Sequence, residues 1–520
     1  MALGVRSRSS RSLLHLLCPG LLALGLLMPL GARAQPTAEQ ARALELQLRA
    51  WLVGLIGPNM PVSERPFQVT AEDDHYRIES NITGPVADTG LSIESSPLAV
   101  NGKPLDGARW ELEPIDRPAS IRVIRDLPDA KGFRSVSVKI GGEAGHWLLD
   151  PSFATASTFE TTIRDYVARR EWANGSQTSR IERLISQSTW EPTEGGRLNI
   201  VTSVTAEHPT SEGALPDGGR LILTAERETT TGRLMELAPE RIGEAIRAAA
   251  ELAPLVRAEI QIYEKAAPTD CTGEGCSQAA TSQHGTPTQR QALHALIQAV
   301  RGLMTGMNGH ATFDKVHIIA GPHEASLDRA AFGTDAIVLD GMLHARLSLA
   351  VDGLDSPEIP AGVFRQYLPR HVALTPRVSG IPSTAGIDLL LRAIDSPDDN
   401  NSEQLQAEAK GLMRQGPLTF GLDDVTLDLG PARLTASGEV QVPAPEPEEI
   451  SGHADISATG LDALVKQAHT QPDLRRALPV LIMLKGLGEQ DGEATVWHVT
   501  YRDRQWLVNG NDLTQMVPGK

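Results

Sequence analysis

The chain has 520 residues, 65 of them acidic and 48 basic, which gives a formal net charge of −17. This acidic balance, with only 20 aromatic residues, excludes the basic footprint and stacking surface that nucleic acid binding requires. Hydrophobic residues make up 41% of the chain, which is enough to bury a substantial core. Three cysteines are too few for a disulfide-rich scaffold.

The first 34 residues have the three parts of a secretory signal. Arginines without any acid precede an apolar stretch at 13–30, and the stretch is followed by the small residues Ala32 and Ala34. We expect cleavage between Ala34 and Gln35 and a periplasmic location. An uncleaved membrane anchor is the alternative, and only then would the protein contact a membrane through this segment. Cleavage leaves 44 basic residues against 65 acidic ones, a net charge of −21.

Cleavage also removes Cys18 and leaves Cys271 and Cys276. In an exported protein such a close pair predicts a local disulfide. The alternative, a redox-active pair, usually has two intervening residues and a helix N-terminus beside it.

In chain order, residues 37–57 have the apolar spacing of a helix packed on a sheet. A membrane-surface helix is the alternative, but its polar face is not basic. Residues 65–230 alternate apolar and polar side chains between turn signals, which predicts an antiparallel meander. Helical spacing returns at 233–266. A loop rich in Pro, Thr, Gly and Ser follows at 267–288, before a short helix at 288–306.

The second half repeats this order. Strands are predicted at 311–377, and helices at 384–395 and after Asn401, which with Gln404 forms a capping pair. Alternating strands follow, and Thr459 is the predicted cap of a helix from 460. A second helix at 473–487 and a hairpin at 494–508 complete the pattern.

The fold class we expect is therefore α+β, with large antiparallel β-meander sheets and packed amphipathic helices in two β-plus-helix halves. The predicted domains are the signal peptide at 1–34, an N-terminal half at 35–266, a loop linker with the cysteine pair at 267–290 and a C-terminal half at 291–520.

The standard catalytic and phosphate-binding motifs are not found in the sequence, so we expect no cofactor, no metal and no catalytic residue. Three weaker groups are candidate sites. His317 and His323 could form a metal pair, but Pro322 interrupts a shared strand. The acidic loop at 395–403 could bind calcium, but capping and solvation explain it better. Asp423, Asp424 and Asp428 could be paired carboxylates, but a solvated strand face is expected. The scattered tryptophans predict core packing rather than sugar stacking.

A family resemblance rests on three places in the sequence: the helix leading to Ile56-Gly57-Pro58, the segment 367–382, and the segments 437–464 and 508–510. Through these the chain resembles a family of uncharacterised exported proteins of alphaproteobacteria, catalogued as domain of unknown function 2125. It is also similar, in architecture only, to AsmA-like envelope proteins with β-grooves. The resemblance implies an exported protein of strand–helix pattern and supplies no catalytic residues.

Three functions are compatible with these patterns. The first is a non-enzymatic cell-envelope protein that binds a lipid or other amphiphile on an uncovered apolar sheet face. The second is an envelope assembly scaffold that binds a protein partner. The third is a hydrolase with an unrecognised site, which would need His317 or His371 beside Asp or Ser in a cleft.

Overall fold

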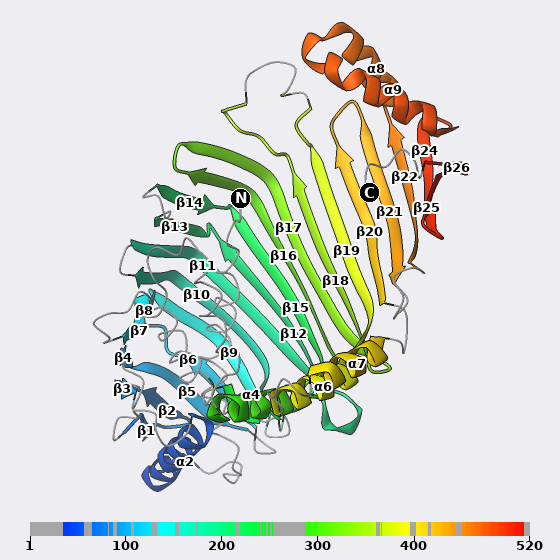
Figure 1. Ribbon diagram of the computed structural model, residues 1–520. Helices are drawn as coiled ribbons and strands as arrows, with labels where there is room; N and C mark the ends of the chain where they lie inside the picture. Colours follow the sequence, from blue (N-terminus) through cyan, green and yellow to red (C-terminus); the bar gives the residue numbers. More distant parts are fainter. Residues whose placement is uncertain are drawn as a thin grey trace, which may run out of the picture. The chain divides into compact units, whose positions relative to one another are not determined.

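The computed structural model describes residues 35–56, 65–81, 83–86, 91–105, 109–125, 133–150, 155–172, 175–214, 219–239, 241–242, 244–245, 248–249, 252, 287–359, 365, 367–395, 402–413, 418–442 and 450–513. Most of these residues form antiparallel β-sheet, with helices at several places along the chain (Figure 1). Within the described residues, no helix combines the length and apolar character that a membrane span requires. Residues 1–33, Ala34 of the predicted cleavage site and the pair Cys271 and Cys276 lie outside the described residues.

The chain divides into two compact units, and each unit is made of two separate segments of the chain. Residues 1–214 and 231–304 form unit 1, and residues 215–230 and 305–520 form unit 2. The domain boundaries expected from the sequence stay a prediction.

Unit 1 holds thirteen complete strands among its described residues. They are β1 (Phe67–Ala71), β2 (Tyr76–Ser80), β3 (Gly84–Val86), β4 (Leu91–Ser95), β5 (Leu98–Pro104), β6 (Trp110–Pro114), β7 (Ala119–Arg125), β8 (Phe133–Ile140), β9 (Gly142–Asp150), β10 (Thr155–Trp172), β11 (Gly175–Pro192), β12 (Leu198–Glu207) and β13 (Thr210–Ala214). Its helices are α2 (Ala38–Ile56), the short 3-10 turn η4 (Glu194–Gly196) and α4 (Pro287–Val300). Strand β15 (Arg227–Leu237) begins in unit 2 and ends in unit 1.

The long strand β10 organises the sheet of unit 1. Along one edge, the first part of β10 pairs with β9 and the second part pairs with β8. Gly141 connects β8 to β9. Along its other edge, β10 pairs with β11. A Cβ at Gly141 would lie 2.6 Å from Asp165 Oδ2 of β10, so this close approach requires glycine. Two ribbons therefore join the same strand: β1–β2–β5–β6 through β9, and β3–β4–β7 through β8.

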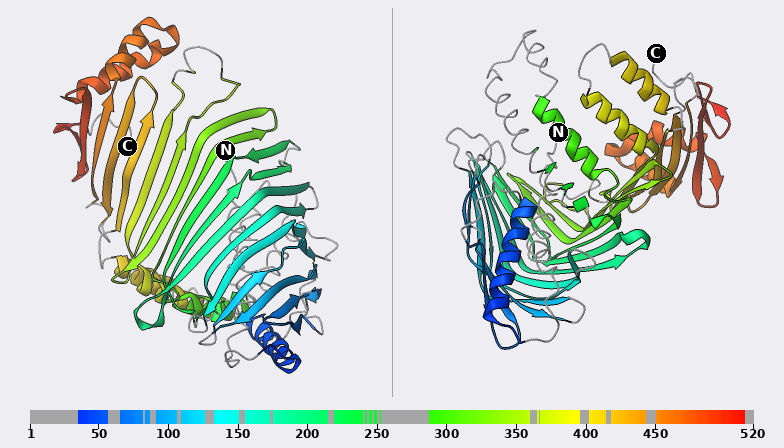
Figure 2. Two further views of the ribbon diagram at one scale, coloured as in Figure 1. Left: turned by 180° about the vertical axis from the view of Figure 1, so that it is seen from behind. Right: turned by 90° about the horizontal axis from the view of Figure 1, so that it is seen from below.

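Helix α2 covers one face of this sheet, as its apolar spacing predicts (Figure 2). It begins with a reciprocal cap, in which the backbone N–H of Gln40 donates to Thr37 Oγ1 and that of Thr37 donates to Gln40 Oε1, both at 3.2 Å. Its buried stripe packs into a core formed by Ala41, Leu44, Leu48, Phe67, Val69, Tyr76, Ile78, Val100, Trp110, Leu112, Trp147 and Phe159. The packed-helix interpretation of residues 37–57 is confirmed.

Unit 2 is a meander of long strands. They are β14 (Arg220–Thr224), β16 (Gly306–Ala320), β17 (His323–Leu339), β18 (Met342–Asp352), β19 (His371–Pro382), β20 (Leu418–Asp428), β21 (Arg433–Val442), β22 (Ser451–Thr459), β23 (Glu489–Asp491), β24 (Ala494–Arg502), β25 (Gln505–Val508) and β26 (Asn511–Asp512). Its helices are α6 (Ser383–Asp395), α7 (Ser402–Met413), α8 (Leu461–Thr470), the 3-10 helix η9 (Pro472–Ala477) and α9 (Leu478–Leu487).

Neighbouring strands of unit 2 pair in sequence order, each antiparallel to the next, from β16 to β22 and then through β24 and β25 to β26. Helices α6 and α7 lie across one end of the β18–β20 strands, and α8 and α9 lie at the other end of β22 and β24 (Figure 1). The antiparallel meander expected for the second half is confirmed for these strands. At 65–230 the antiparallel pairing is confirmed, but the simple meander predicted there is wrong, because β2 pairs with β5, β4 with β7 and β6 with β9.

Two local predictions were wrong. The sequence predicts a helix from 233, but residues 233–237 complete β15. Two leucines three residues apart are too few to establish a helical period over so short a stretch. The residue before α8 is Gly460, not Thr459. Gly460 has φ 74°, and no side chain caps the helix. A Cβ there would lie 2.0 Å from the Pro431 carbonyl oxygen, so the tight connection from β22 requires glycine.

Candidate functional site

One face of the unit 2 sheet carries apolar residues in register across many strands. A first row runs through Ala311, Phe332, Leu349, Leu374, Val425, Ala436, Ile456 and Trp497. A second runs through Met307, Ala336, Ala345, Val378, Phe420 and Val440. A third runs through Phe313, Ala330, Val351, Val372, Leu427, Leu434 and Ala458. We call these three rows the apolar face.

The rows share a face because they are an even number of residues apart on most strands, and side chains alternate with period two. Strand β20 is the exception: Phe420 and Val425 are an odd number apart. The ladder between β20 and β21 shifts between Leu422 and Val425, and a bulge of this kind restores the phase.

Much of the apolar face is open to solvent. Phe332, Leu349 and Leu374 of the first row and Met307, Phe420 and Val440 of the second are between 37% and 49% exposed. In a monomer, contiguous exposed apolar surface of this kind marks an interaction site. The exposed part lies on β16 to β21.

The ends of the unit 2 sheet are better covered. At the β22–β25 end, α8 and α9 pack Leu461, Leu464, Leu481 and Leu487 against Ile456, Trp497, Val499 and Val508. Near the other end of the strands, α6 contacts β18 and β19, and α7 contacts β19. The open apolar area on β16–β21 therefore lies between two helical pairs within unit 2.

The opposite face of the same strands is charged. Asp335, Arg346 and Arg377 follow one another in register on β17, β18 and β19. The Arg377 guanidinium pairs with Asp423 at 2.6 Å and with Glu439 at 2.7 Å. These carboxylates raise the pKa of Arg377, and the largest cause is the hydrogen bond that the guanidinium donates to Glu439. The sheet is thus two-sided, with ion pairs on this face and apolar rows on the other.

The acidic triplet on β20 belongs to this ionic arrangement. Asp423 pairs with Arg346 and Arg377, Asp424 accepts a hydrogen bond from the Thr426 hydroxyl, and Asp428 accepts one from the backbone N–H of Gly430. Each of the three carboxylates thus has its own partner, in agreement with the prediction that they lie on a polar strand face rather than in a catalytic pair. No pair of free carboxylates is formed by them.

The histidines singled out in the sequence lie apart. His317 pairs with Glu324 at 2.8 Å, and His323 pairs with Glu358 at 2.8 Å. These different partners account for each ring, so the two histidines form no metal pair. His371 Nδ1 lies 2.5 Å from Asp352 Oδ1, its register partner on β18. Among the described residues, no hydroxyl or thiol is hydrogen-bonded to the His371 ring, so the nucleophile of a hydrolytic site is not seen there.

Trp110, Trp147 and Trp497 are buried in the sheets, as predicted, whereas Trp172 and Trp506 are exposed. Trp110 and Trp147 belong to the core under α2, and the Trp147 indole N–H donates to Thr161 Oγ1 at 2.7 Å. Trp497 lies under α8 and α9, and its indole N–H donates to the Leu484 carbonyl oxygen at 2.9 Å.

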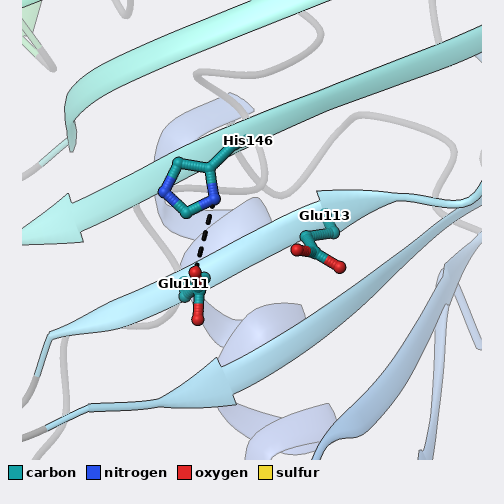
Figure 3. A group of neighbouring side chains, drawn as sticks. All are labelled: Glu111, Glu113 and His146. Carbon is teal, nitrogen blue, oxygen red and sulfur yellow. Dashed lines mark ion pairs between the residues drawn. The ribbon is translucent and has the colours of Figure 1, made fainter.

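A group that the sequence analysis missed lies on unit 1. Glu111 and Glu113 of β6 and His146 of β9 point to the same side of the sheet, away from the core residues beneath α2 (Figure 3). Their nearest donor atoms all lie within 4.8 Å of one another, and His146 Nδ1 is 3.4 Å from Glu111 Oε1. Carboxylate and imidazole are ligands that divalent metals accept. The side chains of Glu111 and His146 are 33% and 51% exposed, however, and an exposed ion pair explains the same geometry.

A buried acid lies on the other side of β9. Glu143 lines a small pocket with Leu98, Val100, Ile115, Arg117 and Trp147. Burial raises the pKa of the Glu143 carboxyl to about 7. The Arg117 guanidinium is directed elsewhere, to Glu79 Oε1 and the Pro97 carbonyl oxygen. Glu143 is therefore a titratable group held in an apolar setting.

No protein-family model, curated protein or solved structure matches this chain. The apolar face is thus the feature of the described residues with the strongest physical argument for a binding role.

Proposed function

We propose that this protein is a non-enzymatic component of the cell envelope that holds the hydrocarbon chain of a lipid or other amphiphile against the apolar face. The supporting observation is the exposure of large apolar side chains, in register on β16–β21, on a sheet whose other face is ionic. Removing this apolar surface from water would contribute favourable free energy in proportion to the area covered.

The dimensions support a hydrocarbon chain as the occupant. From β17 to β21 the apolar face is about 19 Å wide, and between its outer two rows it is about 20 Å long, from standard strand spacing and rise. One leaflet of a bilayer core is about 15 Å thick, which is the depth that a lipid tail occupies. A tail therefore fits on the face along or across the strands.

The chemistry of the face supports the same occupant. The three rows contain Ala, Val, Leu, Ile, Met, Phe and Trp and no charged side chain. Their one hydrogen-bonding side-chain group, the Trp497 indole N–H, is used by the Leu484 carbonyl oxygen. Such a surface selects by shape and apolar contact. The net charge of −21 expected after signal cleavage agrees with this, because it offers no general attraction for an anionic head group.

The proposed function also depends on where the protein is located and on how it is divided. The protein is exported to the periplasm after cleavage between Ala34 and Gln35, and it is built from two β-plus-helix halves of which the second carries the apolar face. The two compact units support this division. The resemblance to domain of unknown function 2125 and the likeness to AsmA-like proteins are part of the same hypothesis.

The test is to purify the protein without detergent, extract it with organic solvent and quantify lipid by mass spectrometry. We expect about one lipid, or a fixed small number, for each chain. The informative variant is Phe420→Glu, which places a charge in the exposed second row. Its matched control is Thr419→Glu on the same strand, whose side chain points to the ionic face because neighbouring residues alternate.

Phe420→Glu should lose most of the bound lipid, and Thr419→Glu should keep it. Absence of stoichiometric lipid from the wild-type protein would contradict the proposal. Crosslinking to one dominant protein partner through Phe332 or Leu349, in place of lipid, would favour the scaffold alternative.

A further inference from the structure

A second exposed apolar surface lies on helix α9 of unit 2. Val480, Ile482, Met483 and Leu484 are 40–53% exposed, and none of the residues of this ten-residue helix is fully buried. A helix that is apolar on nearly all sides is normally buried in protein or lipid. In unit 2, however, α9 packs on its neighbours only through residues such as Leu481 and Leu487.

The fold holds α9 in this position. The Trp497 indole N–H donates to the Leu484 carbonyl oxygen, which joins the helix backbone to β24. Lys485 Nζ forms an ion pair with Asp462 of α8. The Asn509 side-chain N–H donates to the Leu487 carbonyl oxygen at 3.0 Å. Two of these contacts hold the backbone of α9 and the third holds a side chain, so the outward apolar side chains are a built surface.

The hairpin from α8 to α9 has an excess of basic residues, whereas β23, which follows it, carries the exposed acids Glu489 and Asp491. Between Leu461 and Gly488 there are four basic residues, Lys466, Arg475, Arg476 and Lys485, and two acidic ones, Asp462 and Asp473. Arg475 and Arg476 are exposed on η9, immediately before α9, and their side chains have no hydrogen bond or ion pair with another described residue. This hairpin is therefore locally basic although the chain carries a net charge of −17.

We propose that the hairpin from α8 to α9 docks on an anionic lipid bilayer, with the exposed side of α9 entering the interface and Arg475 and Arg476 contacting the head groups. Apolar side chains flanked by basic ones are the combination that interfacial helices use. A ten-residue helix is about 15 Å long and too short to span a bilayer, so α9 lies along the surface. This docking is separate from lipid binding on the apolar face.

The experiment is co-flotation of the full chain with vesicles of phosphatidylethanolamine and phosphatidylglycerol, at low and at high salt. The double variant Ile482→Ser/Met483→Ser tests the apolar contact and should weaken binding at least about tenfold. The double variant Arg475→Gln/Arg476→Gln tests the charge and should weaken it about tenfold at low salt and little at high salt. Leu46→Ser, at another exposed helical leucine in α2, is the matched control and should bind like the wild type.

All these proteins share residues 1–34, so vesicle binding by that segment is common to them and only the differences count. Equal flotation of the wild type and Ile482→Ser/Met483→Ser would overturn the proposal. So would a wild-type dimer that this variant dissociates, because a second copy would then cover α9. Phe420→Glu distinguishes the two proposals: it should lose its extracted lipid and still float with vesicles.

Discussion

Replacing Glu143 by glutamine should remove a pH dependence of stability that burial of this carboxyl creates. Glu143 lines a pocket with Ile115, Trp147 and other apolar residues, and burial raises its pKa from 4.5 to about 7. Between these two values the native state holds a proton that the unfolded chain has already released. The free energy of unfolding therefore falls as the pH rises through this window, and the loss is complete above the native pKa.

The size of the effect follows from the difference between the two pKa values. It corresponds to about 3 kcal/mol in full, of which about 2–3 kcal/mol is lost between pH 5 and pH 8. Glutamine has the same shape and does not ionise. We therefore expect Glu143→Gln to gain about 2–3 kcal/mol relative to the wild type when the pH is raised from 5 to 8.

Urea unfolding curves at pH 5 and pH 8 measure this, with the m-value checked for constancy. Glu160→Gln, at an exposed glutamate on the neighbouring strand β10, is the control and should show no such gain. If Glu143→Gln and the wild type differ by the same amount at both pH values, the reasoning from burial is wrong.

Two further substitutions test the packing in each unit. Leu48→Ala removes a fully buried leucine of α2 and should lower the free energy of unfolding by about 2–5 kcal/mol. Leu46→Ala, on the exposed side of the same helix, should change it by less than about 0.5 kcal/mol. If urea unfolding gave similar losses for the two variants, the core assignment would be contradicted. Gly460→Ala combines a positive φ with a Cβ 2.0 Å from a backbone oxygen. Its control is Gly492→Ala, where φ is also positive but no atom lies within 4 Å. Thermal unfolding should show a loss of unfolding free energy for Gly460→Ala well above the roughly 1–2 kcal/mol expected for the control. Equal losses would show that only the backbone conformation matters.

Much of the secondary structure could be predicted because apolar residues recur along the chain at the spacing of a strand or of a helix. Val136 and Val138 alternate with polar residues on β8, and Ala41, Leu44 and Leu48 recur at helical spacing on α2. Local periodicity cannot distinguish helix from strand over a few residues, which is why the start of the predicted helix at 233 was wrong.

The candidate sites could not be predicted to the same extent. Glu113 and His146 are far apart in sequence and are brought together only because β6 pairs with β9. Likewise, Phe332, Leu349 and Leu374 form one row only through the register of three strands. The sequence shows that each strand has an apolar side, but whether helices cover that side depends on where the chain returns.

The repeated crossing of the chain between its two units has a consequence for dissecting the protein. Strand β14, from residues 215–230, pairs with β16 at Leu221 to Thr224. A fragment that starts at residue 305 would contain nearly all of unit 2 and yet lack this strand. Residues 317–320 of β16 would then present unpaired backbone N–H and C=O groups, a sheet edge prone to pair with another chain. Aggregation of such a fragment would therefore result from the missing edge strand. Adding residues 215–230 as a peptide should reduce it, because β14 would again pair with β16.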